Sequence, residues 1–208
     1  MPEVPRRSAA AIPQTALAGS QGLENIYRSL APSLSDPPNG ADGPLRPILN
    51  AYNEEGSTNH VSFNTTKKTL FSTRPDKCHL NYVVCERDWE AGLAERLESM
   101  DEVEAYVKNH NLGFEVPYDF AGDTHRYRPD YIARIDDGGA EPLKLVIEVK
   151  GQRDEQDAAK AETMRNVWVP AINNAKRFGR WGFLELNDIP YDAATRIRER
   201  LRPLLAAE

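Results

Sequence analysis

The 208-residue sequence has few cysteines and no long apolar segment. No apolar run comes near the ~18 residues that a membrane-spanning helix requires. Cys78 and Cys85 have no second pair of cysteines to complete a metal site, so we interpret them as free thiols in a reducing compartment. Pro13 interrupts the apolar residues after Arg6-Arg7 too early for a secretory signal. We therefore expect a cytoplasmic protein with no membrane partner.

A large excess of basic residues is also missing. The chain has 26 lysines and arginines against 32 aspartates and glutamates, a net charge of −6, which excludes the globally basic surface that typifies many nucleic-acid-binding proteins. The negative excess falls within residues 85–150, which carry 16 acidic and 8 basic side chains. This concentration of carboxylates indicates either a solvated acidic face or a group of acids that binds a cation. Net charge does not distinguish the two.

Proline divides the chain into a tail and a domain. Eight of the fifteen prolines occur in the first 47 residues, mixed with Ser, Ala, Gly and Asn. Such a segment cannot bury enough apolar surface to offset the entropy of ordering, so residues 1–43 are predicted to be a disordered tail or linker. Residues 44–208 are predicted to be the domain, with short strands in 44–85, a core in 86–186 and a closing helix in 187–208.

The core is predicted to be an α/β (α+β) domain with the element order α-β-β-β-α-β. Apolar residues at helical spacing predict a first helix from Asp88 to Met100, and Ser99 followed by Glu102 resembles a capping box that opens a second helix, ending at Gly113. Three antiparallel strands follow, and a crossover helix bent by a proline leads to a fourth strand. The expected product is a mixed four-stranded central sheet flanked by helices. Its strands are expected at 114–120, 126–135, 143–149 and 181–186. The crossover helix is expected at 154–176, with a bend at Pro170.

The hairpin between the second and third predicted strands brings charged side chains together. If its turn centres on Gly139, Asp130 lies directly opposite Glu148, and Lys150 lies on the same face as Glu148. The other face is predicted to be apolar core, and Pro129 places Asp130 at the start of a strand. Two facing carboxylates are destabilising, so Lys150 and a hard divalent cation such as Mg²⁺ are expected to compensate them. The alternative is a charged edge strand in water with no cation.

These residues carry a resemblance to a known family. Pro129-Asp130, a hairpin and then Glu148-Val149-Lys150, in this element order, resemble the PD-(D/E)xK nuclease superfamily and its restriction-endonuclease-like core. Over residues 44–186 the chain is similar to the C-terminal endonuclease region of the restriction (Res) subunit of type III restriction enzymes. The segments that extend this similarity include Lys77–Asn81, Tyr106–Asn109, Tyr127–Tyr131, Leu145–Gly151 and Trp168–Asn173.

The resemblance implies an endonuclease that hydrolyses the phosphodiester bonds of double-stranded DNA. Asp130 and Glu148 are then expected to hold Mg²⁺, or Mn²⁺ in its place, with the carbonyl of Val149 as an added ligand. Lys150 is expected to position or activate the attacking water and to offset negative charge in the transition state.

Other residues are candidates for supporting roles. The first helix of such nucleases often supplies a fourth acid, for which Glu90 fits best, and its alternatives are Glu86, Glu95 or no metal-binding glutamate at all. Gln152, Gln156 and Lys160 are candidates for contacts with DNA or with metal-associated water. The alternative is that they lie on a solvated helix surface without such a role. Trp168 and Trp181 are interpreted as core residues rather than surfaces for base stacking.

One part of the family pattern is missing from these residues. The chain has no Gly-x-x-x-x-Gly-Lys-Ser/Thr phosphate loop, so it carries no ATP site and cannot translocate along DNA by itself. We expect a detached nuclease domain, a truncated gene product or a standalone relative. A helicase motor and a methylation or specificity subunit are the expected partners, and little sequence specificity is expected from this chain alone.

Two other functions stay open at this point. A catalytically silent DNA-binding or assembly module would keep the fold for docking, and a nuclease of RNA or of single strands would use the same motif. The set Asp130, Glu148 and Lys150 favours catalysis, because a silent module has no need to hold two facing carboxylates.

Overall fold

The structure is a computed structural model. It describes residues 3–4, 58–86, 88–151, 154–187, 194–195 and 197–199. The predicted tail, except for Glu3–Val4, therefore lies outside the described residues, as do Gln152 and most of the predicted closing helix. Within the described part of the chain, no helix has the length and apolar character needed to span a membrane.

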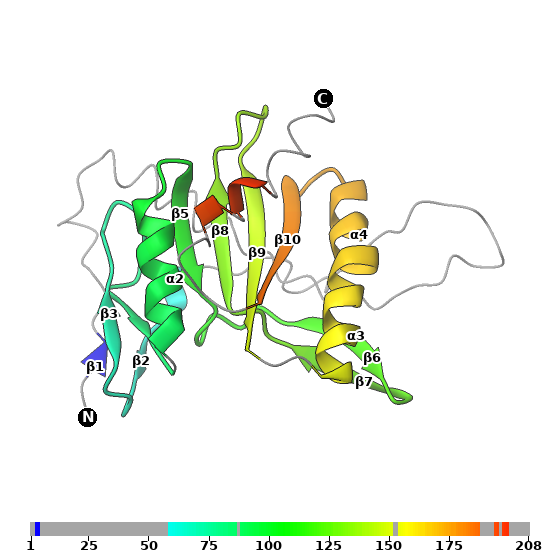
Figure 1. The fold of residues 1–208 in the computed structure, drawn as a ribbon, viewed down its shortest axis with the longest axis horizontal. Helices are drawn as coiled ribbons and strands as arrows, with labels where there is room; N and C mark the ends of the chain where they lie inside the picture. The colour runs from blue at the N-terminus through cyan, green and yellow to red at the C-terminus, as the bar shows by residue number, and fades with distance from the viewer. Residues whose placement is uncertain are drawn as a thin grey trace.

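A mixed four-stranded sheet forms the centre of the molecule, as predicted (Figure 1). Its order is β10-β9-β8-β5, in which β5 with β8 and β8 with β9 are antiparallel and β9 with β10 is parallel. The parallel pair requires a crossover connection, which the helical segment between β9 and β10 supplies. The strands are β5 (Val103–Lys108), β8 (Tyr131–Ile135), β9 (Leu143–Lys150) and β10 (Arg180–Asn187).

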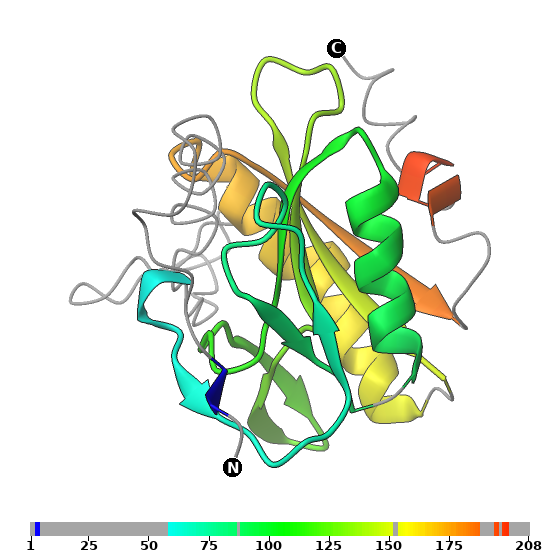
Figure 2. The same ribbon diagram turned by 90° about the vertical axis from the view of Figure 1, so that its left-hand side faces the viewer.

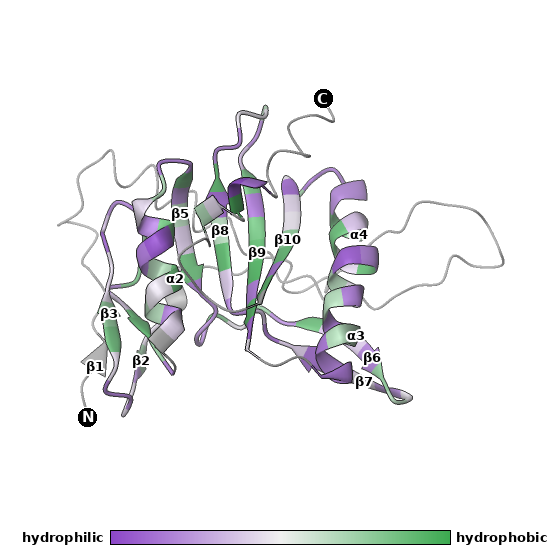
Figure 3. Cartoon of the chain, in the orientation of Figure 1, coloured by the Kyte–Doolittle hydropathy of each residue, from purple (hydrophilic) through white to green (hydrophobic). Residues whose placement is uncertain are grey.

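Helices cover both faces of this sheet. Helix α2 (Asp88–Ser99) lies on one face, where the Tyr131 hydroxyl donates to the carbonyl of Glu90 at 3.0 Å. Helix α3 (Glu155–Thr163), the π-helical turn η3 (Met164–Trp168) and helix α4 (Val169–Asn174) lie on the opposite face (Figures 1 and 2). Figure 3 shows the apolar strands enclosed between helices whose outer surfaces are polar.

The prediction of one apolar and one polar sheet face was too simple. Ile132 and Val146 lie on the face that carries Glu148, and both have no exposed surface. A sheet that is covered on both sides buries successive residues, so its strands are apolar runs rather than alternating patterns. Charged side chains lie at both ends of this face: Arg134 and Lys144 pair near the β8–β9 turn, and Glu148 and Lys150 lie where β9 finishes.

The predicted helix from Ser99 to Gly113 is wrong, because this segment contains strand β5. Ser99 is the last residue of α2, and its hydroxyl donates to the carbonyl of Arg96 instead of capping a new helix. Residues 105–108 are all buried, so β5 is a strand covered on both faces and lacks the alternation that reveals a half-buried strand. The first strand of the sheet is therefore β5.

The segment predicted as the first strand belongs to a separate hairpin. Strands β6 (Val116–Phe120) and β7 (Asp123–Tyr127) pair only with each other among the described strands, and the hairpin lies beside α3 (Figure 1). The predicted strand 126–135 is consequently divided between β7 and β8. Pro129 lies in the break, where its missing N–H costs no ladder hydrogen bond.

The crossover helix is interrupted close to the predicted position. The π-helical turn η3 separates α3 from α4, and α4 has Pro170 in its first turn. Because proline has no N–H to donate, the α-helical hydrogen-bond pattern cannot run unchanged through this point. Trp168 and Trp181 are buried and contact each other edge to face, with ring centroids 5.2 Å apart, which confirms them as core residues.

Short strands precede the core, as predicted for this part of the chain. Strand β1 (Glu3–Val4) pairs with β2 (Phe63–Asn64), and β3 (Leu70–Ser72) pairs with β4 (Tyr82–Val84). A 3₁₀ turn at Thr58–His60 precedes them. The two cysteines are free, as predicted, and both are buried.

An ion pair fixes the end of the sheet that carries the β8–β9 turn. The side chain of Asp137 is fully buried and accepts two hydrogen bonds from Arg180 at the start of β10, at 2.9 and 2.8 Å. A bidentate pair of this kind is both charge-assisted and geometrically specific. It ties the turn directly to the neighbouring parallel strand.

We predict that Asp137→Asn lowers the free energy of unfolding by about 1–3 kcal/mol, because the Arg180 guanidinium loses its charged partner. Urea titration measures this change. The matched control is Asp136→Asn, which removes the same charge from the adjacent exposed position. Equal stability of the two variants would contradict a role for the pair.

Candidate active site

A cavity of about 240 Å³ lies at the end of the sheet where β9 finishes. It is bounded by the first turns of α2 and α3, by the entrance to β8 and by the end of β9. Five carboxylates and one lysine line it, so the wall is strongly acidic. The lining residues are Glu86, Trp89, Glu90, Asp130, Glu148, Val149, Lys150, Gly151 and Asp157.

The register of the β8–β9 hairpin brings Asp130 to Glu148. Tyr131 pairs with Ile147, which is the register predicted from a turn centred on Gly139. Asp130 lies one residue before β8, and its backbone N–H donates to Glu148 Oε2 at 3.2 Å. The N–H of Val149 donates in turn to Asp130 Oδ2 at 2.9 Å. The two predicted acids are therefore held together by the backbone.

Tyr127 orients Glu148 and was missed in the sequence. Its hydroxyl donates to Glu148 Oε2 at 2.7 Å, and both residues are buried. Burial, and then the charge of Glu148, hold the pKa of Tyr127 well above its ordinary value, so the phenol keeps its proton and remains a donor. Tyr127 is the last residue of β7, and its place beside Glu148 depends on how the β6–β7 hairpin packs against the sheet.

Lys150 is shared between two carboxylates. Its ammonium lies 2.6 Å from Glu148 Oε1 and 3.0 Å from Asp157 Oδ1. Asp157, also missed in the sequence, is a buried residue of α3 whose Oδ1 also contacts Lys160 at 2.9 Å. Lys150 therefore lies between the sheet and α3.

The electrostatics of the site show an excess of buried negative charge. Burial, and then the charge of Glu148, raise the pKa of Asp130 to about 7. Burial also raises the pKa of Glu148, against the opposing effect of Lys150. For Lys150, burial works against the ammonium, but Glu148 and Asp157 outweigh it and the pKa of Lys150 is raised. One lysine does not fully compensate this group of acids.

The residues fit a divalent cation that prefers oxygen ligands. Glu148 is buried and Asp130 is partly buried beside a cavity, and both carboxyl groups have raised pKa values. A cation there would relieve their repulsion. In the described part of the chain, no three His, Cys, Asp or Glu side chains are arranged as a ready-made metal site. Mg²⁺ does not need one, because it is usually held by one or two carboxylates together with water and substrate phosphate.

The three candidates for a fourth acid are placed differently. Glu90 lines the cavity, but its Oε2 lies 2.8 Å from the Lys108 ammonium and also accepts a hydrogen bond from the N–H of Glu86. Glu86 lines the cavity too, although its side chain is largely exposed and lies 3.4 Å from Lys67. Glu95 is exposed on α2 and does not line the cavity. Glu90 and Glu86 are therefore near the site, whereas Glu95 is not.

Two of the three residues predicted to contact DNA, Gln156 and Lys160, contact the β6–β7 hairpin in this structure. Gln156 donates to the Tyr118 hydroxyl at 2.7 Å, and the Lys160 ammonium lies 5.9 Å from the centre of the Tyr118 ring. Both contacts join α3 to β6. Gln152 lies outside the described residues.

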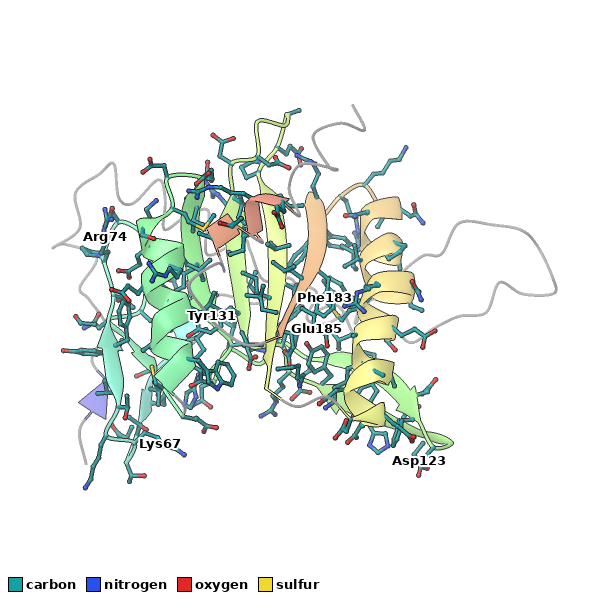
Figure 4. The ribbon with its side chains drawn as sticks, in the orientation of Figure 1. Lys67, Arg74, Asp123, Tyr131, Phe183 and Glu185 are labelled. Carbon is teal, nitrogen blue, oxygen red and sulfur yellow. The ribbon has the colours of Figure 1, made fainter. Side chains whose placement is uncertain are left out.

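A further acid lies beside Glu148 in the neighbouring strand. Glu185 of β10 pairs with Glu148 in the parallel register, so the two side chains leave the same face. Figure 4 shows Phe183 and Glu185 on the side of the sheet that α3 covers, and Tyr131 on the side of α2. Arg165 of η3 lies 2.6 Å from Glu185 Oε2 and compensates its charge.

The fold and the site together define a class of protein. A mixed four-stranded sheet covered by helices on both faces, with carboxylates and a lysine at one end, is the architecture of restriction-endonuclease-like nucleases. The family model described as "Endonuclease domain" matches residues 76–195, more than half of the chain. The chain belongs to this endonuclease domain family.

Other comparisons are more distant. A comparison with curated proteins gave no significant match. One solved structure, described as "Crystal structure of protein VC1899 from Vibrio cholerae", shares 14% sequence identity with a TM-score of 0.24. The similarity covers 57% of this chain and 32% of that protein, so the chain spans about a third of its length.

We predict that Asp130→Asn stabilises the protein in EDTA, increasingly so as the pH rises from about 4 to 7. The folded protein retains the Asp130 proton to about pH 7 whereas the unfolded chain releases it near pH 4, so the stability of the wild type falls across this range. Each unit of pKa difference is worth about 1.4 kcal/mol. Denaturant titrations at several pH values measure the effect.

Asp123→Asn provides the control for this prediction, because it removes one carboxylate from an exposed position on the β6–β7 hairpin (Figure 4). A stability difference between Asp130→Asn and wild type that stays constant from pH 4 to pH 8 would contradict the proposed burial of charge.

Proposed function

We propose that this chain is a Mg²⁺-dependent endonuclease domain that hydrolyses phosphodiester bonds of double-stranded DNA. The observation that carries the proposal is the contact group of Asp130, Glu148 and Lys150 at an acidic cavity. Membership of the endonuclease domain family gives independent support for the chemistry.

The side chains have separable roles in this proposal. Asp130 and Glu148 would hold the cation, with the carbonyl of Val149 as a further oxygen ligand. Mg²⁺ in such a site supplies charge neutralisation at the attacked phosphate and acidifies the attacking water. Lys150 places a positive charge at the cavity, where negative charge develops on the phosphate in the transition state. Tyr127 keeps Glu148 in one orientation by binding Oε2.

We further propose that the chain corresponds to the nuclease region of type III restriction enzymes. Its support is the similarity over residues 44–186, which the matched family segment 76–195 overlaps. A helicase motor and a methylation or specificity subunit would then act with it, and recognition of a DNA sequence would come from the partner. The acidic cavity agrees with weak DNA binding by this chain alone, because affinity for duplex DNA depends largely on lysine and arginine contacts to phosphate.

Plasmid nicking tests the proposal. Wild-type protein with Mg²⁺ is expected to nick supercoiled plasmid, and EDTA is expected to abolish the activity. Glu148→Gln and Lys150→Met are expected to lower the rate by about 10²-fold or more. The first removes a proposed ligand of the cation, and the second removes the positive charge that faces the reacting phosphate. Glu95→Gln, an exposed glutamate on α2, serves as the control and is expected to retain the rate.

Calorimetric titration with Mg²⁺ separates the remaining outcomes. Binding by wild type that Glu148→Gln abolishes, without nicking, would indicate a metal site that needs its motor or partner subunit. DNA binding with neither Mg²⁺ binding nor nicking would replace the proposal with a catalytically silent module. Nicking that survives in EDTA or in Glu148→Gln would overturn the assigned site.

A further inference from the structure

The carboxylate of Glu148 is already largely occupied by the chain itself. Its Oε2 accepts from the Tyr127 hydroxyl at 2.7 Å and from the Asp130 N–H at 3.2 Å, and its Oε1 lies 2.6 Å from the Lys150 ammonium. A carboxylate offers about four acceptor positions. Three of them are therefore in use, and a cation that binds Glu148 has to share Oε1 with an ammonium group.

Such sharing is unfavourable, because it places a divalent cation close to a positive charge in a partly buried site. Lys150 has a flexible four-carbon side chain, so its ammonium can move while its backbone stays in β9. The Lys150 side chain is only 18% exposed, which limits its access to water. The ammonium therefore needs another carboxylate within the cavity.

Asp157 is placed to be that carboxylate. Its Oδ1 already lies 3.0 Å from the Lys150 ammonium, and it belongs to a different element from Glu148. The residue is fixed in the first turn of α3, where its N–H donates to the side chain of Asp154, the residue that caps the helix. Lys160 contacts the same oxygen at 2.9 Å and favours the charged form of Asp157.

We propose that Asp157 is a positioning residue that retains the Lys150 ammonium when a divalent cation binds to Glu148. The inference rests on the proposed function, because it assumes that a cation binds there. Without a cation, Lys150 compensates both carboxylates. With a cation, Lys150 is held by Asp157 and stays at the cavity, where the proposed reaction needs its positive charge.

The test is calorimetric titration of the 208-residue protein with Mg²⁺. Asp157→Asn is expected to weaken Mg²⁺ binding by about tenfold, within the range typical of residues that orient metal ligands. Asp157→Glu keeps the carboxylate and is expected to restore most of the affinity. Glu155→Gln removes an exposed acid from the same helical turn and is expected to leave the affinity unchanged.

A double-mutant cycle with Lys150→Met distinguishes positioning from simple attraction between Asp157 and the cation. If Asp157 acts by retaining the ammonium, Asp157→Asn has almost no effect on Mg²⁺ binding in the Lys150→Met background. If Asp157 attracts the cation directly, the loss of affinity persists in that background, and the inference is overturned.

The failures of the two proposals can be told apart. Wild type that binds Mg²⁺ through Glu148, with an affinity that Asp157→Asn does not change, would overturn the role of Asp157 and leave the metal site intact. Wild type that does not bind Mg²⁺ at all would overturn the proposed metal site together with this inference. Circular dichroism of each variant in EDTA checks that the fold is retained.

Discussion

The site depends on one electrostatic constraint, which is that two carboxylates are held against each other at the buried start of a hairpin. The backbone N–H groups of Asp130 and Val149 fix this approach, because each donates to the carboxylate of the facing residue. Neither acid can move away without breaking one of these bonds. The surrounding side chains must therefore stabilise the negative charge where it stands.

The chain meets this constraint by pairing most acids of the cavity with lysines. Lys108 pairs with Glu90, Lys150 with Glu148, and Lys160 with Asp157. Within the described residues, the carboxylate of Asp130 is bonded only by a backbone N–H. Asp130 is therefore the acid least compensated by the protein, and this agrees with its raised pKa and with the place where we propose that a cation binds.

The sequence predicted the parts of the site that depend on local geometry. The register of the β8–β9 hairpin followed from the turn at Gly138-Gly139, where Gly138 has the positive φ of 82° that a tight turn requires. Strand β5 could not be recognised, because burial on both faces removed the alternation that would have revealed it. Tyr127 and Asp157 were missed for a different reason: each comes from an element whose position is set only when it packs against the sheet.

The separation between the β8–β9 turn and the cavity has a practical consequence. Strand β9 runs between them for 8 residues, which places the turn roughly 25 Å from Lys150. Ala140 is exposed in this turn, whereas the native thiols Cys78 and Cys85 are buried. A cysteine introduced at Ala140 would thus be the accessible thiol of the described part of the chain, and a fluorophore attached there could report binding of the proposed DNA substrate or partner subunit while staying far from the carboxylates of the cavity.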